Sequence, residues 1–183
     1  MPTLLGHLGQ MLSEKPLHDI TGGEQKLVPL EVVSVLPDQQ SQGPLVGFAT
    51  TYTRTVTDAD VALFALVTGD QNPLHLDADY AATTHYGRRT VPAMLIGGLV
   101  EAALVAALPG VTGVACKESL TFPGPAFIDE PITVTLTVQC LSADGHLVTC
   151  AVEAADPQGK PVATGEVQCH IGDLPPAPLD ADA

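Results

Sequence analysis

The stretch Gly69–His75 (Gly-Asp-Gln-Asn-Pro-Leu-His) holds two proton-transfer groups a few residues apart, a carboxylate at Asp70 and an imidazole at His75. Pro73 disfavours helical geometry at Asn72, and the leading glycine is a natural helix C-cap, so we expect a loop here and not regular helix. A helix-terminating turn accounts for the glycine, the asparagine and the proline. It does not account for the carboxylate and the imidazole, so the spacing predicts an acid–base site within one turn.

A metal site is the rival interpretation of the same segment. Asp70, His75 and Asp77 would be its ligands, but their spacing does not match the common zinc ligand sets. We therefore expect no metal. Three other histidines have no evident partner and are expected at the surface or in loops: His85, His146 and His170.

Composition excludes some function classes. The 183 residues carry a net charge of -14, and the seven lysines and arginines form no basic stripe, so nucleic acid is not an expected partner. No N-terminal segment resembles a signal peptide, and the four cysteines show no C-x-x-C pair, so we expect a cytoplasmic protein with reduced thiols. Cys140, Cys150 and Cys169 lie in alternating runs and are expected in the core.

The elements around the Gly69–His75 segment can be predicted from capping signals. A Thr-rich strand is expected over 48–56, followed by a helix that starts at Asp58, with Thr57 as N-cap and Asp60 completing a capping box. That helix ends at Gly69 and therefore delivers Asp70 to its C-terminal end. A second short helix is expected over 79–84, capped by Asp77 and ending before Gly87.

Residues 91–108 are almost wholly apolar and approach the length of a membrane span. Pro92, Gly97, Gly98 and Glu101 interrupt the run, and no flanking charges support insertion, so no membrane partner is expected. A helix that is apolar all round is typical of a buried position. We predict a central helix wrapped by sheet and ended by Pro109-Gly110.

The remaining chain predicts four strands in antiparallel meander order, at about 111–122, 131–141, 146–155 and 161–171. Matching the apolar faces of the second and third of these requires an odd-length loop, so we predict a three-residue turn over 143–145 with Gly145 left-handed. Cys140 then lies opposite Val148 and does not face Cys150. The sum is an α+β hot-dog fold, a curved antiparallel sheet around a long central helix.

The domain organisation follows from composition. Residues 1–45 are an N-terminal extension and linker, within which a helix over 4–12 and a strand near 30–36 are expected. Residues 46–172 form the hot-dog domain. The proline-rich and acidic stretch 173–183 is expected to be a disordered tail.

These motifs resemble the MaoC-like hydratases, the (R)-specific enoyl-CoA hydratases. The resemblance covers about residues 47–171, and residues 1–45 have no counterpart in the short stand-alone members. It is carried by the following segments in this order: Asp58–Ala65, Gly69–Asp77, Tyr80-Ala81, Val91–Leu95, Leu108-Pro109-Gly110 and Leu120-Thr121-Phe122.

The resemblance implies syn addition of water to trans-2-enoyl thioesters by a homodimer without a redox cofactor, the acyl group being carried on CoA or on acyl carrier protein. One group must take a proton from water, another must protonate C2, and donors must hold the charge on the thioester oxygen. By resemblance Asp70 is the base and His75 the acid, although the two could share both roles. Asn72 orients the water or the loop, or is only structural.

The resemblance also assigns substrate-binding residues and one departure. Members usually carry His-Gly where this chain has Pro92-Ala93, so the backbone N–H of Ala93 must serve as the oxyanion donor, and a positive φ there would disfavour alanine. Five further residues are expected near the substrate: Met94, Gly97, Glu101, Arg88 and Arg89. Glu101 would shorten the acyl pocket or select a polar chain if it points inward, and is structural otherwise.

Two alternative functions remain open on the sequence. A hot-dog acyl-CoA thioesterase would also place a carboxylate near a helix N-terminus and would release free CoA from a saturated acyl-CoA. A non-catalytic acyl-thioester-binding protein is suggested by Pro92-Ala93 and by the N-terminal extension.

Overall fold

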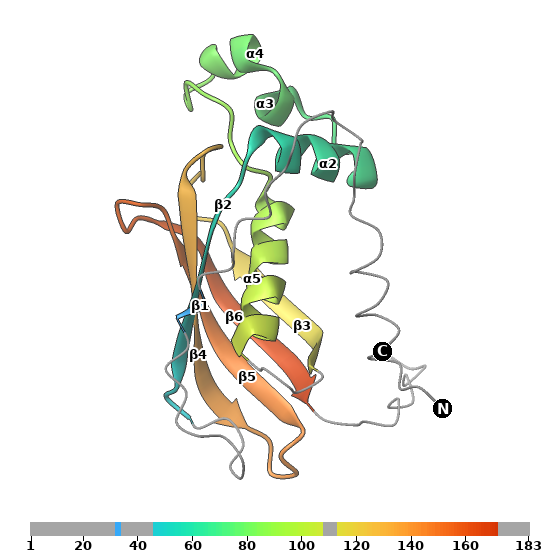
Figure 1. Ribbon diagram of the computed structural model, residues 1–183, viewed down its shortest axis with the longest axis vertical. Coiled ribbons are helices and arrows are strands. Elements are labelled where there is room, and N and C mark those ends of the chain that lie inside the picture. The colour runs from blue at the N-terminus through green and yellow to red at the C-terminus, as the bar shows by residue number, and fades with distance from the viewer. Residues whose placement is uncertain (1–31, 34–45, 108–112, 172–183) are drawn as a thin grey trace. The chain divides into compact units, whose positions relative to one another are not determined.

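The computed structural model describes residues 32–33, 46–107 and 113–171 (Figure 1). Four helices are α2 (Asp58–Thr68), α3 (Pro73–Leu76), α4 (Ala78–Ala82) and α5 (Ala93–Ala107). Six strands are β1 (Val32–Val33), β2 (Ala49–Thr55), β3 (Gly113–Thr121), β4 (Pro131–Leu141), β5 (Leu147–Ala155) and β6 (Pro161–Ile171). The predicted helix over 4–12, the Pro109-Gly110 stop and the 173–183 tail lie outside the described residues.

The strands form one antiparallel sheet in the order β1-β2-β4-β5-β6-β3. The strand positions predicted from the alternating pattern are confirmed, including the short strand near 30–36. The meander prediction is wrong for β3, which pairs with β6 and not with the next strand along the chain. At this crossing a Cβ on Gly165 would lie 1.9 Å from the carbonyl oxygen of Ser119, so only glycine allows the two backbones to approach this closely.

The β4–β5 hairpin solves the register problem in a different way from the predicted turn. Gly145 is left-handed as expected, with φ 76°. Leu141 pairs with Val148, so the hairpin closes between 142 and 147, and a bulge between positions 138 and 140 supplies the odd residue. Cys140 is consequently opposite Thr149, and the predicted pairing with Val148 is wrong.

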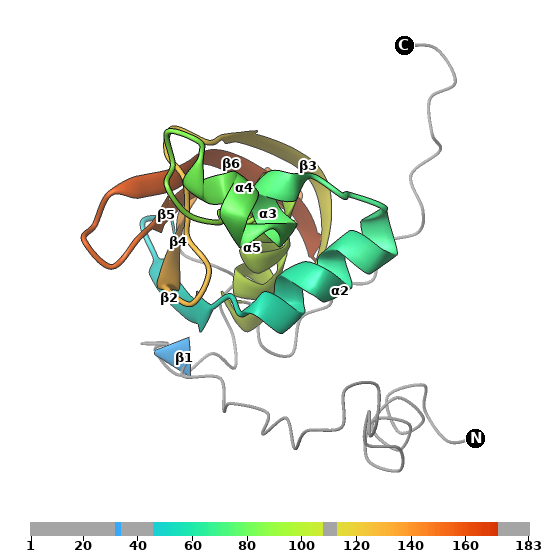
Figure 2. The same ribbon diagram turned by 90° about the horizontal axis from the view of Figure 1, so that it is seen from above.

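The helix α5 lies in the concave face of the sheet, which curves around it when seen from above (Figure 2). Its inner face is buried in the core: Ile96, Gly97, Leu99, Val100, Ala103 and Leu104. The outer face is not covered, because Met94 is 62% exposed and Val105 is 69% exposed. The expectation of a helix buried on all sides is therefore wrong for the single chain, in which only the inner face of α5 is buried. None of the described helices is long and apolar enough to cross a membrane.

The four cysteines are free thiols, and they do not share one environment. Cys150 and Cys169 are buried in the core as predicted, and burial raises the pKa of each thiol to about 11. Cys140 is exposed, which corrects the expectation that it packs in the core. The bulge beside it explains the difference, since an extra residue turns the following side chains to the other face.

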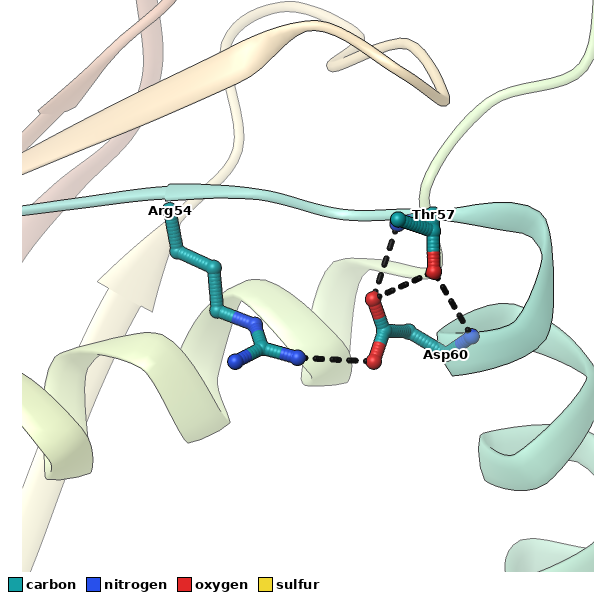
Figure 3. A network of polar contacts seen from close by, with 3 residues as sticks. All are labelled: Arg54, Thr57 and Asp60. Atoms are coloured by element: carbon teal, nitrogen blue, oxygen red, sulfur yellow. Dashed lines mark hydrogen bonds and ion pairs between the residues drawn. The ribbon is translucent and has the colours of Figure 1, made fainter. Parts of the chain in front are cut away.

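The start of α2 is fixed by a network of polar contacts that includes Arg54 on the preceding strand, β2 (Figure 3). The backbone N–H and the hydroxyl of Thr57 each donate to Oδ2 of Asp60 at 2.8 Å, and Arg54 donates to Oδ1 at 2.8 Å. Partial burial alone would raise the pKa of Asp60, but the Thr57 hydrogen bonds and the Arg54 charge outweigh it and hold the pKa below its ordinary value. The capping box predicted from sequence is confirmed.

We expect Asp60→Ala to lower the free energy of unfolding by about 1 kcal/mol, the usual effect of losing a cap. Because the pKa of this carboxyl is lowered, its contribution is complete above pH 3.8 and is lost as the pH falls through the folded-state value. Urea unfolding of both proteins at neutral pH and near pH 3 measures this. Asp79→Ala, in the first turn of α4, is the matched control. A gap between Asp60→Ala and wild type that does not shrink in acid would contradict this account.

Candidate active site

The segment between α2 and α3 is shaped by three hydrogen bonds that each span two residues. The N–H of Asp70 donates to the hydroxyl of Thr68 at 3.2 Å, and the N–H of Asn72 donates to Oδ1 of Asp70 at 3.1 Å. The N–H of Leu74 then donates to Oδ1 of Asn72 at 3.0 Å. Together with the left-handed Gly69 at the end of α2, these bonds fix where each side chain of the segment points.

The segment contains helix where the sequence predicted a loop. Pro73 is the first residue of α3, with Asn72 as its N-cap, so His75 belongs to a one-turn helix and not to a loop. Proline has no N–H and a helical φ, and therefore suits the first position of a helix. The restriction that proline places on the preceding residue was correctly anticipated, whereas the helical turn that begins at the proline was not.

The imidazole of His75 is held by Thr90, which lies 15 residues later and is 4% exposed. Nδ1 of His75 is 2.8 Å from the carbonyl oxygen of Thr90 and 3.1 Å from its hydroxyl. A carbonyl oxygen only accepts, so Nδ1 carries a hydrogen. Nε2 is then the ring atom that gains or loses a proton.

His75 lines a cavity of about 630 Å³, a size typical of small-molecule sites. Its wall is formed by the α3 region, the 85–91 loop, the start of α5 and the 122–127 loop. The β5–β6 turn adds one residue. The lining residues that bear on the chemistry are Asn72, His75, His85, Tyr86, Thr90, Ala93, Gly124, Phe127 and Lys160. The structure thus places three of the predicted site residues, Asn72, His75 and Ala93, in the wall of one cavity.

The first turn of α5 has free backbone donors, and its first residue, Ala93, lines this cavity. The N–H groups of Leu95 and Ile96 donate to the carbonyl of Pro92 at 3.0 Å and 3.4 Å. Within the described residues, the N–H groups of Ala93 and Met94 have no backbone acceptor, as expected for the first positions of a helix. Ala93 does not have a positive φ, so the backbone strain considered for alanine at this position is absent.

Asp70 occupies a different place from the other predicted catalytic residue. It is half-buried, its Oδ1 accepts from the N–H of Asn72, and it does not line the cavity. No hydrogen bond joins Asp70 to His75 in the described part of the chain. Oδ2 of Asp70 is therefore the oxygen available to a water molecule.

Three predicted substrate-binding residues of α5 lie outside this cavity. Met94 is exposed, and a Cβ at Gly97 would lie 3.5 Å from the Cε of Met94. Glu101 is half-buried and faces Glu118 of β3. Partial burial raises the pKa of Glu118, and the nearby Glu101 carboxyl raises it further. The structure thus places Glu101 against β3. This position favours the structural role over a role in the acyl pocket.

Arg88 and Arg89 also lie outside the cavity wall. Arg88 makes an ion pair with Glu130 at 2.6 Å, and its guanidinium lies 3.7 Å from the centre of the Phe127 ring. Arg89 makes an ion pair with Asp58 at 2.6 Å. Both charges are thereby partly neutralised by the protein itself.

Sequence reasoning missed Thr90, Tyr86 and Lys160 as cavity residues, because each reaches the site through a contact distant in sequence. His85 is exposed as expected but lines the cavity. His146 is in the β4–β5 turn, as expected, whereas His170 is half-buried on β6, contrary to expectation. Among the described residues, no group of three or more His, Cys, Asp or Glu side chains is placed to hold a metal ion.

Comparison with known proteins places this geometry in a family. The model of the MaoC like domain matches residues 44–155. An (R)-specific enoyl-CoA hydratase of Rhodospirillum rubrum is 35% identical over 129 residues, which are 68% of this chain and 86% of that protein.

Two solved structures are similar over most of their length. The (R)-hydratase of Aeromonas caviae involved in PHA biosynthesis is 32% identical with a TM-score of 0.68, and the match covers 74% of this chain and 100% of that one. The R-hydratase PhaJ1 of Pseudomonas aeruginosa is 34% identical with a TM-score of 0.66, covering 73% and 92%. The chain therefore belongs to the MaoC-like domain family and has the hot-dog fold.

Proposed function

We propose that this chain is an (R)-specific 2-enoyl thioester hydratase, a hydro-lyase that also runs the reverse dehydration. One observation carries the proposal: the imidazole of His75, with its hydrogen-bonded Nδ1, lines the same cavity as Ala93, whose backbone N–H has no acceptor among the described backbone groups. The (R)-specific hydratases to which the chain is similar supply the reaction class. The proposed compartment is the cytoplasm, where four free thiols stay reduced.

In hydration, water adds its oxygen to C3 of the enoyl thioester and a proton goes to C2. The π electrons move toward the thioester carbonyl, so negative charge builds on its oxygen before C2 is protonated. The N–H of Ala93 is placed to hold this charge, because it is free and lies at the positive end of the α5 dipole. Alanine retains the backbone donor that the reaction needs.

Asp70 and His75 carry the two proton transfers in this proposal. We place the attacking water between Oδ2 of Asp70 and Nε2 of His75, the atoms of these two side chains to which no described residue is hydrogen-bonded. Asp70 takes the proton from water, while the doubly protonated ring of His75 delivers its Nε2 proton to C2. The proton on Asp70 then returns to Nε2 through a water molecule, which restores both groups for the next turnover. The Thr90 carbonyl keeps Nδ1 protonated throughout, so the transfer is confined to Nε2.

We expect Asp70→Asn and His75→Gln each to lower the rate of crotonyl-CoA hydration by about 10²–10⁴-fold, the usual contribution of a positioned acid or base. Loss of the enoyl absorbance measures the rate, and circular dichroism checks that the variants fold. Asp79→Asn and His146→Gln are the matched controls and should keep wild-type rates. Full activity in either site variant would remove that residue from the mechanism. Release of free CoA from butyryl-CoA, without hydration of crotonyl-CoA, would indicate a thioesterase instead.

The oxyanion role of Ala93 can be separated from its side chain. Ala93→Pro removes the N–H at the first position of α5, where proline is compatible with a helix. We expect kcat to fall by about 10²–10³-fold, as when other oxyanion donors are removed. Ala93→Ser keeps the N–H and should retain activity. An Ala93→Pro variant with wild-type kcat would show that another group holds the oxyanion.

We also propose that the chain forms a homodimer through the outer face of α5 and the adjoining edge strand β3. The nine-residue strand β3 ends the sheet and pairs with β6 alone in the described part of the chain. Beside it the outward face of α5 exposes Met94 and Val105. An unprotected edge next to an exposed apolar face is typical of a surface that a partner covers.

In such a two-fold interface each substitution appears twice, so Val105→Glu should convert the dimer to a monomer. Analytical ultracentrifugation across a concentration series measures the change in mass. Val67→Glu is the control, since Val67 lies on α2 and is 77% exposed, compared with 69% for Val105. A wild-type protein that is monomeric at all concentrations would refute the dimer. Dissociation by the control alone would move the interface to α2.

A further inference from the structure

The described part of the chain contains five lysines and arginines, and one of them lines the cavity. The three arginines, Arg54, Arg88 and Arg89, are each in an ion pair with a carboxylate. Lys117 is exposed on β3 and does not line the cavity. Lys160 lines the cavity and makes no ion pair with any described carboxylate.

The backbone of Lys160 is fixed by the turn that joins β5 to β6. Oδ1 of Asp156 accepts from the N–H groups of Gln158 and Lys160 at 2.9 Å and 2.8 Å, and the N–H of Asp156 donates to the Lys160 carbonyl at 3.0 Å. Gly159 supplies the left-handed residue of this turn, with φ 77°. Oδ1 of Asp156 thereby accepts from backbone groups of the turn, and of these turn residues only Lys160 lines the cavity.

The stem of the lysine lies beside Gly124, a residue of the 122–127 loop. A Cβ at Gly124 would lie 3.6 Å from Cε of Lys160 and 3.1 Å from the carbonyl oxygen of Pro161, so a side chain at this position would crowd both. Gly124 itself lines the cavity. Lys160 thus lines the same cavity as His75 and Ala93.

We infer that Lys160 binds the phosphate of the phosphopantetheine arm that carries the acyl thioester. This inference rests on the proposed function, because it needs a thioester substrate. The phosphate is common to CoA and to acyl carrier protein, and an ammonium group is a strong point-charge donor to phosphate oxygens. On a chain of net charge -14, whose described arginines are paired internally, an unpaired cation in the cavity is what offsets the repulsion of an anionic substrate.

The two arginines predicted from sequence to bind substrate are replaced in this role by a lysine 71 positions after Arg89. Arg88 and Arg89 form ion pairs that stabilise the protein's own loops, and leaving those pairs to bind phosphate would cost the contacts to Glu130 and Asp58. Lys160 meets the phosphate without breaking a pair.

The test compares Lys160→Met with Lys160→Arg and with Lys117→Met as the matched control, using three crotonyl thioesters: of pantetheine, which lacks the phosphate, of CoA and of acyl carrier protein. Lys160→Met should raise KM by about tenfold for whichever phosphate-bearing carrier the wild type uses, with kcat unchanged, because one charge-assisted hydrogen bond is lost. KM for the pantetheine thioester should not change. Lys160→Arg and Lys117→Met should resemble wild type.

The carrier with the lower wild-type KM identifies whether CoA or acyl carrier protein is the source of the phosphate. An equal rise of KM for the pantetheine thioester would overturn the inference, since it would mean that the lysine shapes the cavity and does not bind phosphate. An unchanged KM for both phosphate-bearing carriers would overturn it as well.

A binding measurement keeps this inference distinct from the proposed reaction. In the His75→Gln background, calorimetry should give about a tenfold higher Kd for crotonyl-CoA when Lys160 is replaced by methionine. Equal Kd values would refute the role of Lys160. Hydration by the wild type combined with equal Kd values would refute the phosphate site alone, whereas a Kd difference without any hydration would refute the reaction alone.

Discussion

The packing of α5 into the concave face of the sheet is the constraint on which the rest of the domain depends. Ile96, Leu99, Val100 and Leu104 are each at most 6% exposed, and burial of such a side chain contributes about 1.5–3 kcal/mol. Once α5 is packed there, the position of its N-terminus relative to the sheet is fixed. The segment before it must then reach that position from α4.

Thr90 shows how this constraint is transmitted to the chemistry. Its N–H donates to the Leu74 carbonyl at 3.3 Å, and it forms an isolated antiparallel bridge with Phe127. The neighbouring N–H of Val91 donates to the Ala126 carbonyl at 2.8 Å. Two residues therefore join α3, the 122–127 loop and the start of α5. These backbone hydrogen bonds connect the imidazole, the cavity wall and the start of α5 in one framework.

Charge is distributed unevenly over this acidic protein. The arginines on β2 and in the loop after α4 form ion pairs with Asp60, Asp58 and Glu130. Between α5 and β3 two carboxyls, Glu101 and Glu118, face one another. The described residues that line the cavity include neither these ion pairs nor these carboxyls. Its wall contains histidines and a lysine but no described carboxylate. An anionic substrate in this cavity therefore meets a wall that contains no described carboxylate.

The features that could be predicted from the sequence are those determined by neighbouring residues. Thr57 and Asp60 mark the start of α2, Gly69 marks its end, and the strand boundaries follow from alternation. Pro73 was misinterpreted, because proline restricts the residue before it and also favours a helix after it, and only the first effect was used.

Features set by distant contacts could not be predicted in this way. The pairing of β3 with β6 depends on where α5 ends and on the close backbone contact between Gly165 and Ser119. The role of Lys160 depends on a stem that crosses Gly124, and that of Thr90 on a side chain 15 residues earlier. Pattern alone carries no information on such contacts. The register of the β4–β5 hairpin was missed for a related reason, since a bulge and an odd-length turn satisfy the same parity.

The series of hydrogen bonds between residues two apart, from Thr68 to Leu74, has a consequence for the kinetics of folding. Each of its bonds closes a ring between residues two apart, so it requires almost no loop closure and can form and break within the unfolded chain. The contact of His75 with Thr90 and the pairing of β3 with β6 span far longer stretches and must await the collapsed sheet. The carboxylate half of the site is thus assembled early in folding, and the imidazole acquires its fixed orientation only when the domain closes.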